Sequence, residues 1–251
     1  MTETNRCTET NRYRDAWEGF WREASPEPGA VFWDADPALT AAVHLPLFTP
    51  HLTEPGLPLV DLGCGNGTQS VFLAGRLPGP VLGVDVSAAA LERARAQDAA
   101  GAVRFRELDV TDGPAVAALS GELGDANVYM RGVLHQTAPQ DRDVLAGTIA
   151  TLLGERGRAF VVEPAEAAGK ALGALAQGPG GPPAKLLPVL KHGITPGAVA
   201  DAAVPGHFEA AGLDVLASGE APLATTEHTP DGTPVELPSL WLVVGCARRR
   251  G

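Results

Sequence analysis

The chain of 251 residues has few cysteines and lysines and no apolar run long enough to span a membrane. Its cysteines, Cys7, Cys64 and Cys246, are far apart and odd in number, so they form neither a disulfide framework nor a metal-ligand spacing. We therefore expect a reducing, cytoplasmic setting. Residues 1–14 are polar and lack the apolar stretch that signal peptides carry, so we expect no signal peptide.

Positive charge is also scarce. The chain has 19 Lys and Arg against 30 Asp and Glu, which gives a formal net charge of −11. Electrostatics therefore oppose a polyanionic partner, and we expect neither a nucleic acid nor an anionic membrane. The six histidines show no paired ligand spacing, so no metal site is predicted.

Three alternating glycines follow a short apolar run and an acid. Residues 57–62 read as a buried strand and residues 68–76 as the helix after it. The turn between them, Asp61-Leu62-Gly63-Cys64-Gly65-Asn66-Gly67, has few large side chains. Such a turn lets backbone N–H groups approach a ligand at the positive end of a helix.

The dinucleotide fingerprint G-x-G-x-x-G is incomplete in this turn. Gly63 and Gly65 fit it, but Thr68 occupies the third position and the extra glycine comes one residue early, at Gly67. The run from Asp61 to Gly67 resembles instead the first motif of the class I S-adenosylmethionine-dependent methyltransferases. An NAD-dependent dehydrogenase is the less favoured alternative.

The chain alternates between predicted strands and helices after this turn, which indicates an α/β fold with a parallel sheet and helices on both faces. Two last strands follow each other without a helix, so they are expected to pair antiparallel. Further strands are predicted at 80–85, 103–108, 127–131, 158–163, 213–217 and 240–247, and helices at 11–24, 37–51, 114–119, 139–153 and 196–211. Ser87 is the expected N-cap of one more helix, which carries Leu91, Ala94 and Arg95.

Two acids end the next two strands. Asp85 follows Gly67 by 18 residues, where a carboxylate can accept hydrogen bonds from both ribose hydroxyls, as it also does in NAD enzymes. Asp109 is followed by Val110, a pair that suits an adenine amine and ring. Helix capping by either acid is the simpler alternative.

The methyltransferase resemblance covers about residues 57–163 and implies a Rossmann-like seven-stranded sheet of order 3-2-1-4-5-7-6 with the seventh strand antiparallel. It also implies a binding site for S-adenosylmethionine, with S-adenosylhomocysteine as product. Asp61 would order the methionine end, and backbone near Arg131 would flank the sulfonium. The implied cofactor residues are Asp61, Gly63, Cys64, Gly65, Asn66 and Gly67 for the methionine, Asp85 and Val86 for the ribose, Asp109 and Val110 for the adenine, and Arg131.

The fourth strand runs into Val133-Leu134-His135, which resembles the fourth motif of small-molecule methyltransferases. An imidazole has an ordinary pKa near 6.5, which suits it to deprotonate a hydroxyl or amine at neutral pH. His135 is therefore the candidate base. A structural or substrate-orienting histidine is the alternative.

We expect residues 1–52 to form an N-terminal helical lid and residues 53–251 the methyltransferase domain. Tyr13, Trp17 and Trp21 recur at helical spacing, and with Trp33 and His135 they are candidate acceptor contacts. The alternative is that these aromatic residues only pack against the domain. Residues 164–194, rich in Gly and Pro, are expected to be an irregular insertion, and residues 218–238 a polar loop.

The predicted function is methyl transfer to O or N of a small, partly apolar molecule, with secondary metabolism as the expected setting and with S and C acceptors left open. An S-adenosylmethionine-binding protein that catalyses a reaction other than methylation, such as a cyclisation, is the principal alternative. We expect a monomer or homodimer.

Overall fold

The computed structural model describes residues 3–177, 181–194, 199–229 and 231–246, with the backbone alone for 3–11. Seven strands form one sheet in the order β3-β2-β1-β4-β5-β7-β6, as predicted. The first five are parallel, and β7 is antiparallel to both β5 and β6. The strands are β1 Leu59–Leu62, β2 Val81–Asp85, β3 Val103–Glu107, β4 Asn127–Arg131, β5 Arg158–Pro164, β6 Asp214–His228 and β7 Pro234–Gly245.

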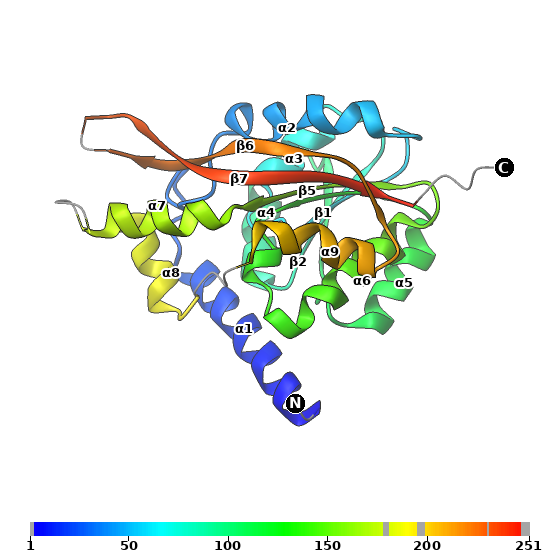
Figure 1. Cartoon of the computed structure of the whole chain (residues 1–251), viewed down its shortest axis with the longest axis horizontal. Coiled ribbons are helices and arrows are strands. Elements are labelled where there is room, and N and C mark those ends of the chain that lie inside the picture. Colours follow the sequence, from blue (N-terminus) through cyan, green and yellow to red (C-terminus); the bar gives the residue numbers. More distant parts are fainter. Residues whose placement is uncertain (1–2, 178–180, 195–198, 230, 247–251) are drawn as a thin grey trace.

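Helices cover both faces of this sheet (Figure 1). The α-helices are α1 Glu3–Glu23, α2 Ala41–Phe48, α3 Thr68–Ala74, α4 Ala88–Gln97, α5 Gly113–Leu123, α6 Arg142–Leu153, α7 Glu166–Gln177, α8 Leu187–Lys191 and α9 Val204–Ala210. Short 3₁₀ turns are η1 Pro37–Leu39, η2 Thr49–His51, η3 Leu134–Gln136, η4 Pro139–Asp141, η5 Ala184–Leu186 and η6 Asp201–Ala203. None of the described helices is both long and apolar enough to cross a bilayer.

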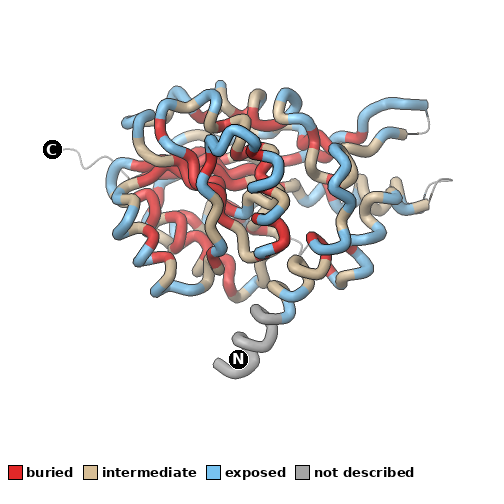
Figure 2. The backbone as a smooth tube through the Cα atoms, turned by 180° about the vertical axis from the view of Figure 1, so that it is seen from behind, coloured by how far each residue is buried: buried red, intermediate tan, exposed pale blue. Residues whose placement is uncertain are grey.

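The central strands are buried on both faces because their side chains alternate between two apolar layers (Figure 2). Val60 and Leu62 of β1 face a core formed with α5, α6 and α9. Leu59 faces a second core that includes Phe48 of α2 and Phe160 of β5. This two-sided burial explains why these strands read as continuous apolar runs in the sequence.

The described chain departs from the predicted elements in three places. Helix α1 begins at Glu3, before the predicted start at residue 11. The segment 164–194 contains α7 and α8, so it is not irregular. Residues 178–180, the first part of its Gly-Pro run at 178–183, lie outside the described residues, as does the predicted start of a helix at 196. Residues 218–238 form most of a long hairpin of β6 and β7 where a loop was expected.

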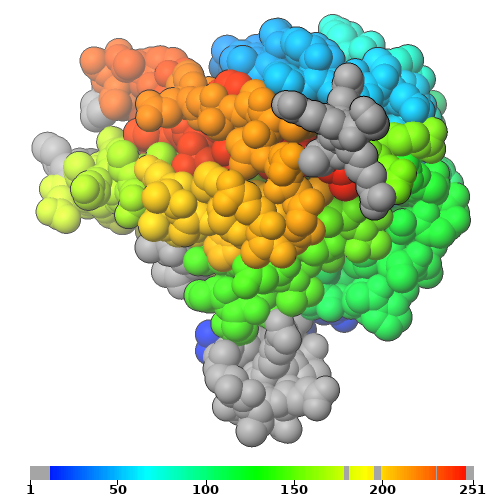
Figure 3. Space-filling view, turned by 45° about the vertical axis from the view of Figure 1, so that its right-hand side comes forward, coloured from blue at the N-terminus to red at the C-terminus, as the bar shows by residue number. Residues whose placement is uncertain are grey.

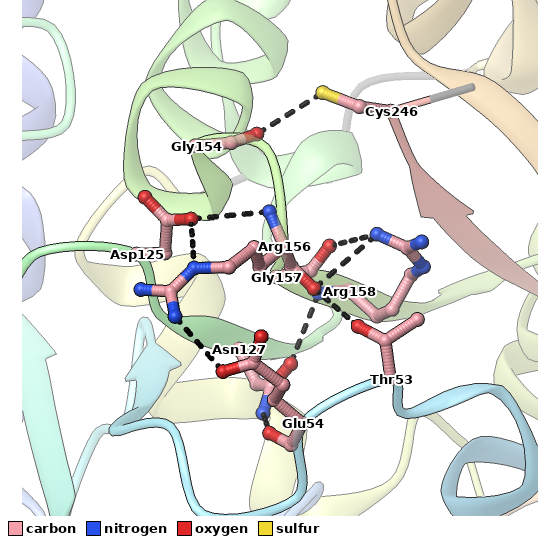
Figure 4. Close-up of polar contacts among 9 residues, drawn as sticks. All are labelled: Thr53, Glu54, Asp125, Asn127, Gly154, Arg156, Gly157, Arg158 and Cys246. Atoms are coloured by element: carbon pink, nitrogen blue, oxygen red, sulfur yellow. Dashed lines mark hydrogen bonds and ion pairs between the residues drawn. The ribbon is translucent and has the colours of Figure 1, made fainter. Parts of the chain in front are cut away.

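A polar cluster ties together the loops at the amino ends of the central strands, away from the carboxyl ends (Figure 4). Arg156 donates from Nε to Asp125 at 2.8 Å and from Nη1 to Glu54 at 2.9 Å. Thr53 donates its hydroxyl to the Arg156 carbonyl at 2.6 Å. Exposed ion pairs of this kind contribute modestly to stability, so we assign the cluster a structural role.

Candidate active site

A cavity of about 730 Å³ lies at the carboxyl ends of β1 to β5, where ligands bind in open α/β sheets. Its walls come from α1, the strand ends, α7, the segment around α8 and the distal half of the β6–β7 hairpin. Every predicted site residue except Gly67 lines it: Tyr13, Trp17, Trp21, Trp33, Asp61, Gly63, Cys64, Gly65, Asn66, Asp85, Val86, Asp109, Val110, Arg131 and His135.

The glycine turn after β1 forms the cavity floor beside α1. Gly63 and Gly65 have φ values of 74° and 54°, in the left-handed region that favours glycine. A Cβ atom added to Gly65 would lie 2.9 Å from Cζ2 of Trp21, so the backbone is exposed directly beneath the indole. Gly67 serves a different purpose, because a Cβ there would meet Ala94 and Phe105 at 2.8–2.9 Å, outside the cavity.

Asp85 fixes the shape of this turn. Its Oδ2 accepts a hydrogen bond from the N–H of Gly65 at 2.9 Å, and its Oδ1 accepts one from the N–H of Ser87 at 2.9 Å. Burial raises the pKa of Asp85, while these backbone donors oppose the rise. The predicted cap is also present, since the Ser87 hydroxyl accepts from the N–H of Ala90.

Asp109 lies at the far end of the same floor, after β3. Its Oδ1 accepts from the N–H and hydroxyl of Thr111 at 2.9 and 2.7 Å. Its Oδ2 lies 3.2 Å from Nη2 of Arg14, which reaches down from α1. Arg14 was not predicted, because nothing in the sequence near it indicates that its partner is 95 residues away.

Asp61 is buried in β1 and accepts a hydrogen bond from the Ser70 hydroxyl at 2.5 Å. Burial raises its pKa to about 6. Burial likewise raises the pKa of the Cys64 thiol, which remains protonated at neutral pH and is a poor nucleophile. Asp61 therefore titrates close to neutrality at the edge of the cavity.

His135 is held by a buried acid, Glu163, at the end of β5. Its Nδ1 lies 2.8 Å from Oε2 of Glu163, which is 1% exposed. Because an ionised carboxylate only accepts, Nδ1 carries the hydrogen and the lone pair is on Nε2. Glu163 was missed, although an acid at a strand end is the signal that found Asp85 and Asp109.

The lone pair of His135 faces a second side chain. Nε2 of His135 lies 2.9 Å from Nε2 of Gln136, whose Oε1 accepts from the Tyr13 hydroxyl at 3.1 Å. Burial raises the pKa of Tyr13 to about 12, which keeps it a donor. A hydrogen-bonded chain thus runs from α1 through Gln136 and His135 to Glu163.

The aromatic residues of α1 both pack and line the cavity. Trp17 and Trp21 lie 5.5 and 6.4 Å from Trp33, measured between ring centroids, in edge-to-face contacts. Glu18, on the same helix, accepts from the Ser87 hydroxyl at 2.8 Å and from the N–H of Ala89 at 3.1 Å. The helix is therefore attached to the start of α4, just after Asp85.

Among the described residues, no group of three or more His, Cys, Asp or Glu side chains could hold a metal ion. The acids around the glycine turn instead give the floor of the cavity a negative character. That charge suits an organic cation lying across the strand ends.

Comparison with known proteins agrees with this geometry. The family model described as a methyltransferase domain matches residues 59–157. An S-adenosylmethionine-dependent methyltransferase from Anabaena variabilis ATCC 29413 is 33% identical, with a TM-score of 0.86 over 93% of this chain and 95% of that one. No curated protein matches the chain.

More distant structures share the fold alone. Geranyl diphosphate C-methyltransferase from Streptomyces coelicolor A3(2) is 15% identical, with a TM-score of 0.58 over 94% of this chain and 98% of that one. Magnesium protoporphyrin IX methyltransferase from Synechocystis PCC 6803 is 19% identical, with a TM-score of 0.53 over 84% of this chain and 83% of that one.

The fold is the Rossmann-like sheet of the class I methyltransferases. The chain belongs to the S-adenosylmethionine-dependent methyltransferase family, its cofactor is S-adenosylmethionine and the product is S-adenosylhomocysteine. The predicted family, sheet order and cofactor are thereby confirmed. The residues present fit this cofactor, because bare backbone at Gly65, an acid at each of three strand ends and the Trp21 indole bound one cavity.

Proposed function

We propose that this chain transfers a methyl group to an oxygen or nitrogen of a small, partly apolar molecule of secondary metabolism. The observation that carries the proposal is His135, which lines the cavity and has its Nδ1 held by the buried Glu163. This arrangement leaves Nε2 as the proton acceptor. The apolar and aromatic walls support a partly apolar acceptor, and we infer that the protein acts in the cytoplasm.

On the cofactor side, we infer that the glycine turn and Asp61 bind the methionine portion. Asp85 binds the ribose and Asp109 binds the adenine amine, with Val86 and Val110 packed against the nucleoside. A carboxylate bound to backbone N–H groups retains further lone pairs, so Asp85 can hold Gly65 and accept ribose hydroxyls together.

The bound cofactor supplies a methyl group that is already activated on a positively charged sulfur. The protein's main contribution is then to hold the acceptor atom in line with that methyl, which is worth about 7–11 kcal/mol through effective molarity. A general base adds about 10²–10⁴-fold. An acceptor hydroxyl or amine that replaces the Gln136 amide at Nε2 passes its proton to His135.

We infer that α1 acts as a lid over the cavity, which would exclude water from the transfer. Three contacts support this role, and each joins the helix to a site element. Arg14 contacts Asp109, Tyr13 contacts Gln136, and Glu18 contacts the start of α4. Trp17 and Trp21 then wall the region where the transferred methyl would lie.

The test is a screen of small hydroxylated and aminated compounds with cofactor tritiated on its methyl group. The expected result is a labelled product that is fourteen mass units heavier than its acceptor. His135→Ala should lower turnover and leave the affinity for S-adenosylhomocysteine unchanged. An acceptor that is converted without gaining label would overturn the proposal and favour a reaction such as cyclisation.

A further inference from the structure

The cavity continues beyond the strand ends into a second region, which we call the outer chamber. Its walls come from α7, the α8 segment and the β6–β7 hairpin. Figures 1 and 3 show the hairpin lying over α7 where both project from the body of the protein. The apolar side chains that define the outer chamber are Leu172, Leu186, Val189, Leu190, Leu223 and Leu237.

The outer chamber differs in charge from the floor beneath the cofactor site. Asp61, Asp85 and Asp109 all lie at the floor. On α7, the charged residues that reach the cavity, Glu166 and Lys170, are exposed to solvent. Because a charge buried against an apolar wall without a partner is costly, the outer chamber favours an uncharged occupant.

The polar atoms of the hairpin wall are already satisfied. The Thr225 hydroxyl lines the cavity, but it donates to the Val235 carbonyl across the hairpin at 2.6 Å. This wall therefore recognises a bound molecule by its shape and by apolar contact more than by hydrogen bonds.

The length of the chamber follows from α7. Ala168, Leu172 and Ala176 line it at spacings of four residues along one helix face. At about 1.5 Å per residue this face is about 12 Å long. The chamber therefore suits an elongated body rather than a compact one.

Two glycines interrupt the same face of α7. Gly169 and Gly173 line the cavity one turn apart, and a Cβ added at either would meet no atom within 4 Å. Glycine inside a helix lowers its stability, and here no described neighbour requires it. A ligand that lies against the bare helix backbone would account for both residues.

We propose that the methyl acceptor is an uncharged molecule with an elongated apolar body, bound in the outer chamber with its nucleophilic atom at His135. Leu190, which lines the cavity and is 51% exposed, then lies at an apolar entrance on α8. This inference rests on the proposed methyl transfer and specifies the class of acceptor.

Three probes of equal length test the charge preference by calorimetry on protein saturated with S-adenosylhomocysteine. They are 1-octanol, octanoate and octylammonium. The alcohol should bind at least tenfold more tightly than either ion. Affinity across the 1-alkanols from butanol to octanol should rise by about fourfold for each methylene buried.

A filling substitution tests the location. Gly173→Phe should weaken octanol binding at least tenfold and leave the affinity for S-adenosylhomocysteine unchanged, with Gly173→Leu intermediate. The matched control is Gly121→Phe, at an exposed helical glycine of α5 outside the cavity whose added Cβ also meets nothing. It should bind octanol as the parent does.

The outcomes separate this inference from the proposed function. Failure of the parent protein to bind S-adenosylhomocysteine would count against the proposed function itself. The proposed acceptor class alone would be overturned if the protein bound that product normally but had equal affinity for the three probes. The same conclusion would follow if neither Gly173 variant changed octanol binding.

Discussion

Nδ1 of His135 lies 2.8 Å from the carboxylate of Glu163, and the same carboxylate accepts hydrogen bonds from the N–H groups of Val133 and Leu134 at 2.9 Å. One buried acid at the end of β5 therefore fixes both the loop after β4 and the imidazole on it. The loop cannot change conformation without leaving a buried carboxylate short of partners, which is costly.

The first prediction is that Glu163→Gln disturbs the tautomer of His135. The glutamine amide would present an N–H donor to groups that are themselves donors, so Nδ1 of His135 would lose its fixed acceptor. Turnover should therefore fall about 10- to 100-fold, which is part of the 10²–10⁴-fold that acid–base catalysis supplies. Nitrogen NMR of the imidazole should show a mixture of tautomers in place of one. Affinity for S-adenosylhomocysteine should be unchanged.

The control for this substitution is Glu122→Gln. Glu122 is an exposed glutamate of α5 that pairs with Arg104 and Arg106 and does not line the cavity. The Glu122→Gln substitution should leave the nitrogen NMR spectrum of the His135 imidazole unchanged. A single unchanged tautomer in Glu163→Gln would contradict the positioning role.

The second prediction concerns pH. Burial raises the pKa of Asp61 to about 6 from an ordinary value of 3.8, so between these values the folded protein binds a proton that the unfolded chain does not. The contribution of Asp61 to the free energy of unfolding therefore falls as pH rises from about 4 to 6, by about 3 kcal/mol at 1.36 kcal/mol per pKa unit.

Urea denaturation of the cofactor-free protein at pH 4 to 7 measures this slope, with Asp61→Asn as the comparison. The parent should lose stability relative to the variant as pH rises through this window. Asp85, whose pKa burial also raises, contributes in the same direction in both proteins. Parallel pH profiles for the two proteins would contradict the raised pKa of Asp61.

Local sequence was enough to find the parts of the site that lie on short, buried parallel strands. The turn after β1 and Asp85 at the end of β2 each follow an apolar run, whereas Asp109 follows β3, in which apolar and charged residues alternate. In each case the strand pattern locates the strand end, and the glycine turn or acid that comes there locates the cavity. Glu163 also lies at a strand end and could have been found in the same way, but a strand pattern does not encode its pairing with His135 across 28 residues. The same holds for the pairing of Arg14 with Asp109 across 95 residues.

The antiparallel pairing of the last two strands was predicted, but the length of their hairpin was missed for a different physical reason. Strand β6 lies at the edge of the sheet, and residues 214–222 alternate between exposed and partly buried, with Gly219 and Pro222 among them. Both residue types are unfavourable in central strands and acceptable at an edge, where the sequence resembles a polar loop. The part of the outer chamber wall that this hairpin builds was therefore not predictable as a pair of strands.

The third prediction is that Asp85→Ala weakens binding of S-adenosylhomocysteine by about 1.5–3 kcal/mol, the range for hydrogen bonds to a charged group. The substitution also frees the N–H groups of Gly65 and Ser87, so a control must remove similar backbone contacts. Asp98→Ala does so, because Asp98 accepts from the N–H groups of Ala102 and Val103 at 3.0 and 2.8 Å outside the cavity.

Calorimetry should show that Asp98→Ala is less stable than the parent yet binds the product normally. Equal loss of affinity in both variants would mean that Asp85 acts by supporting the turn. Normal affinity in a folded Asp85→Ala protein would remove it from the ribose site.

The fourth prediction assigns the Arg131 side chain to the methionine carboxylate. Arg131 lines the cavity, and its side chain forms no hydrogen bond or ion pair with the part of the chain that the structure describes. Arg131→Met should weaken binding of S-adenosylhomocysteine by about 1.5–3 kcal/mol and leave binding of 5′-methylthioadenosine, which lacks the amino-acid portion, unchanged. Arg104→Met, at an exposed arginine paired with Glu122, is the control. Equal losses for both ligands would show that Arg131 supports the site as a whole and does not bind the carboxylate.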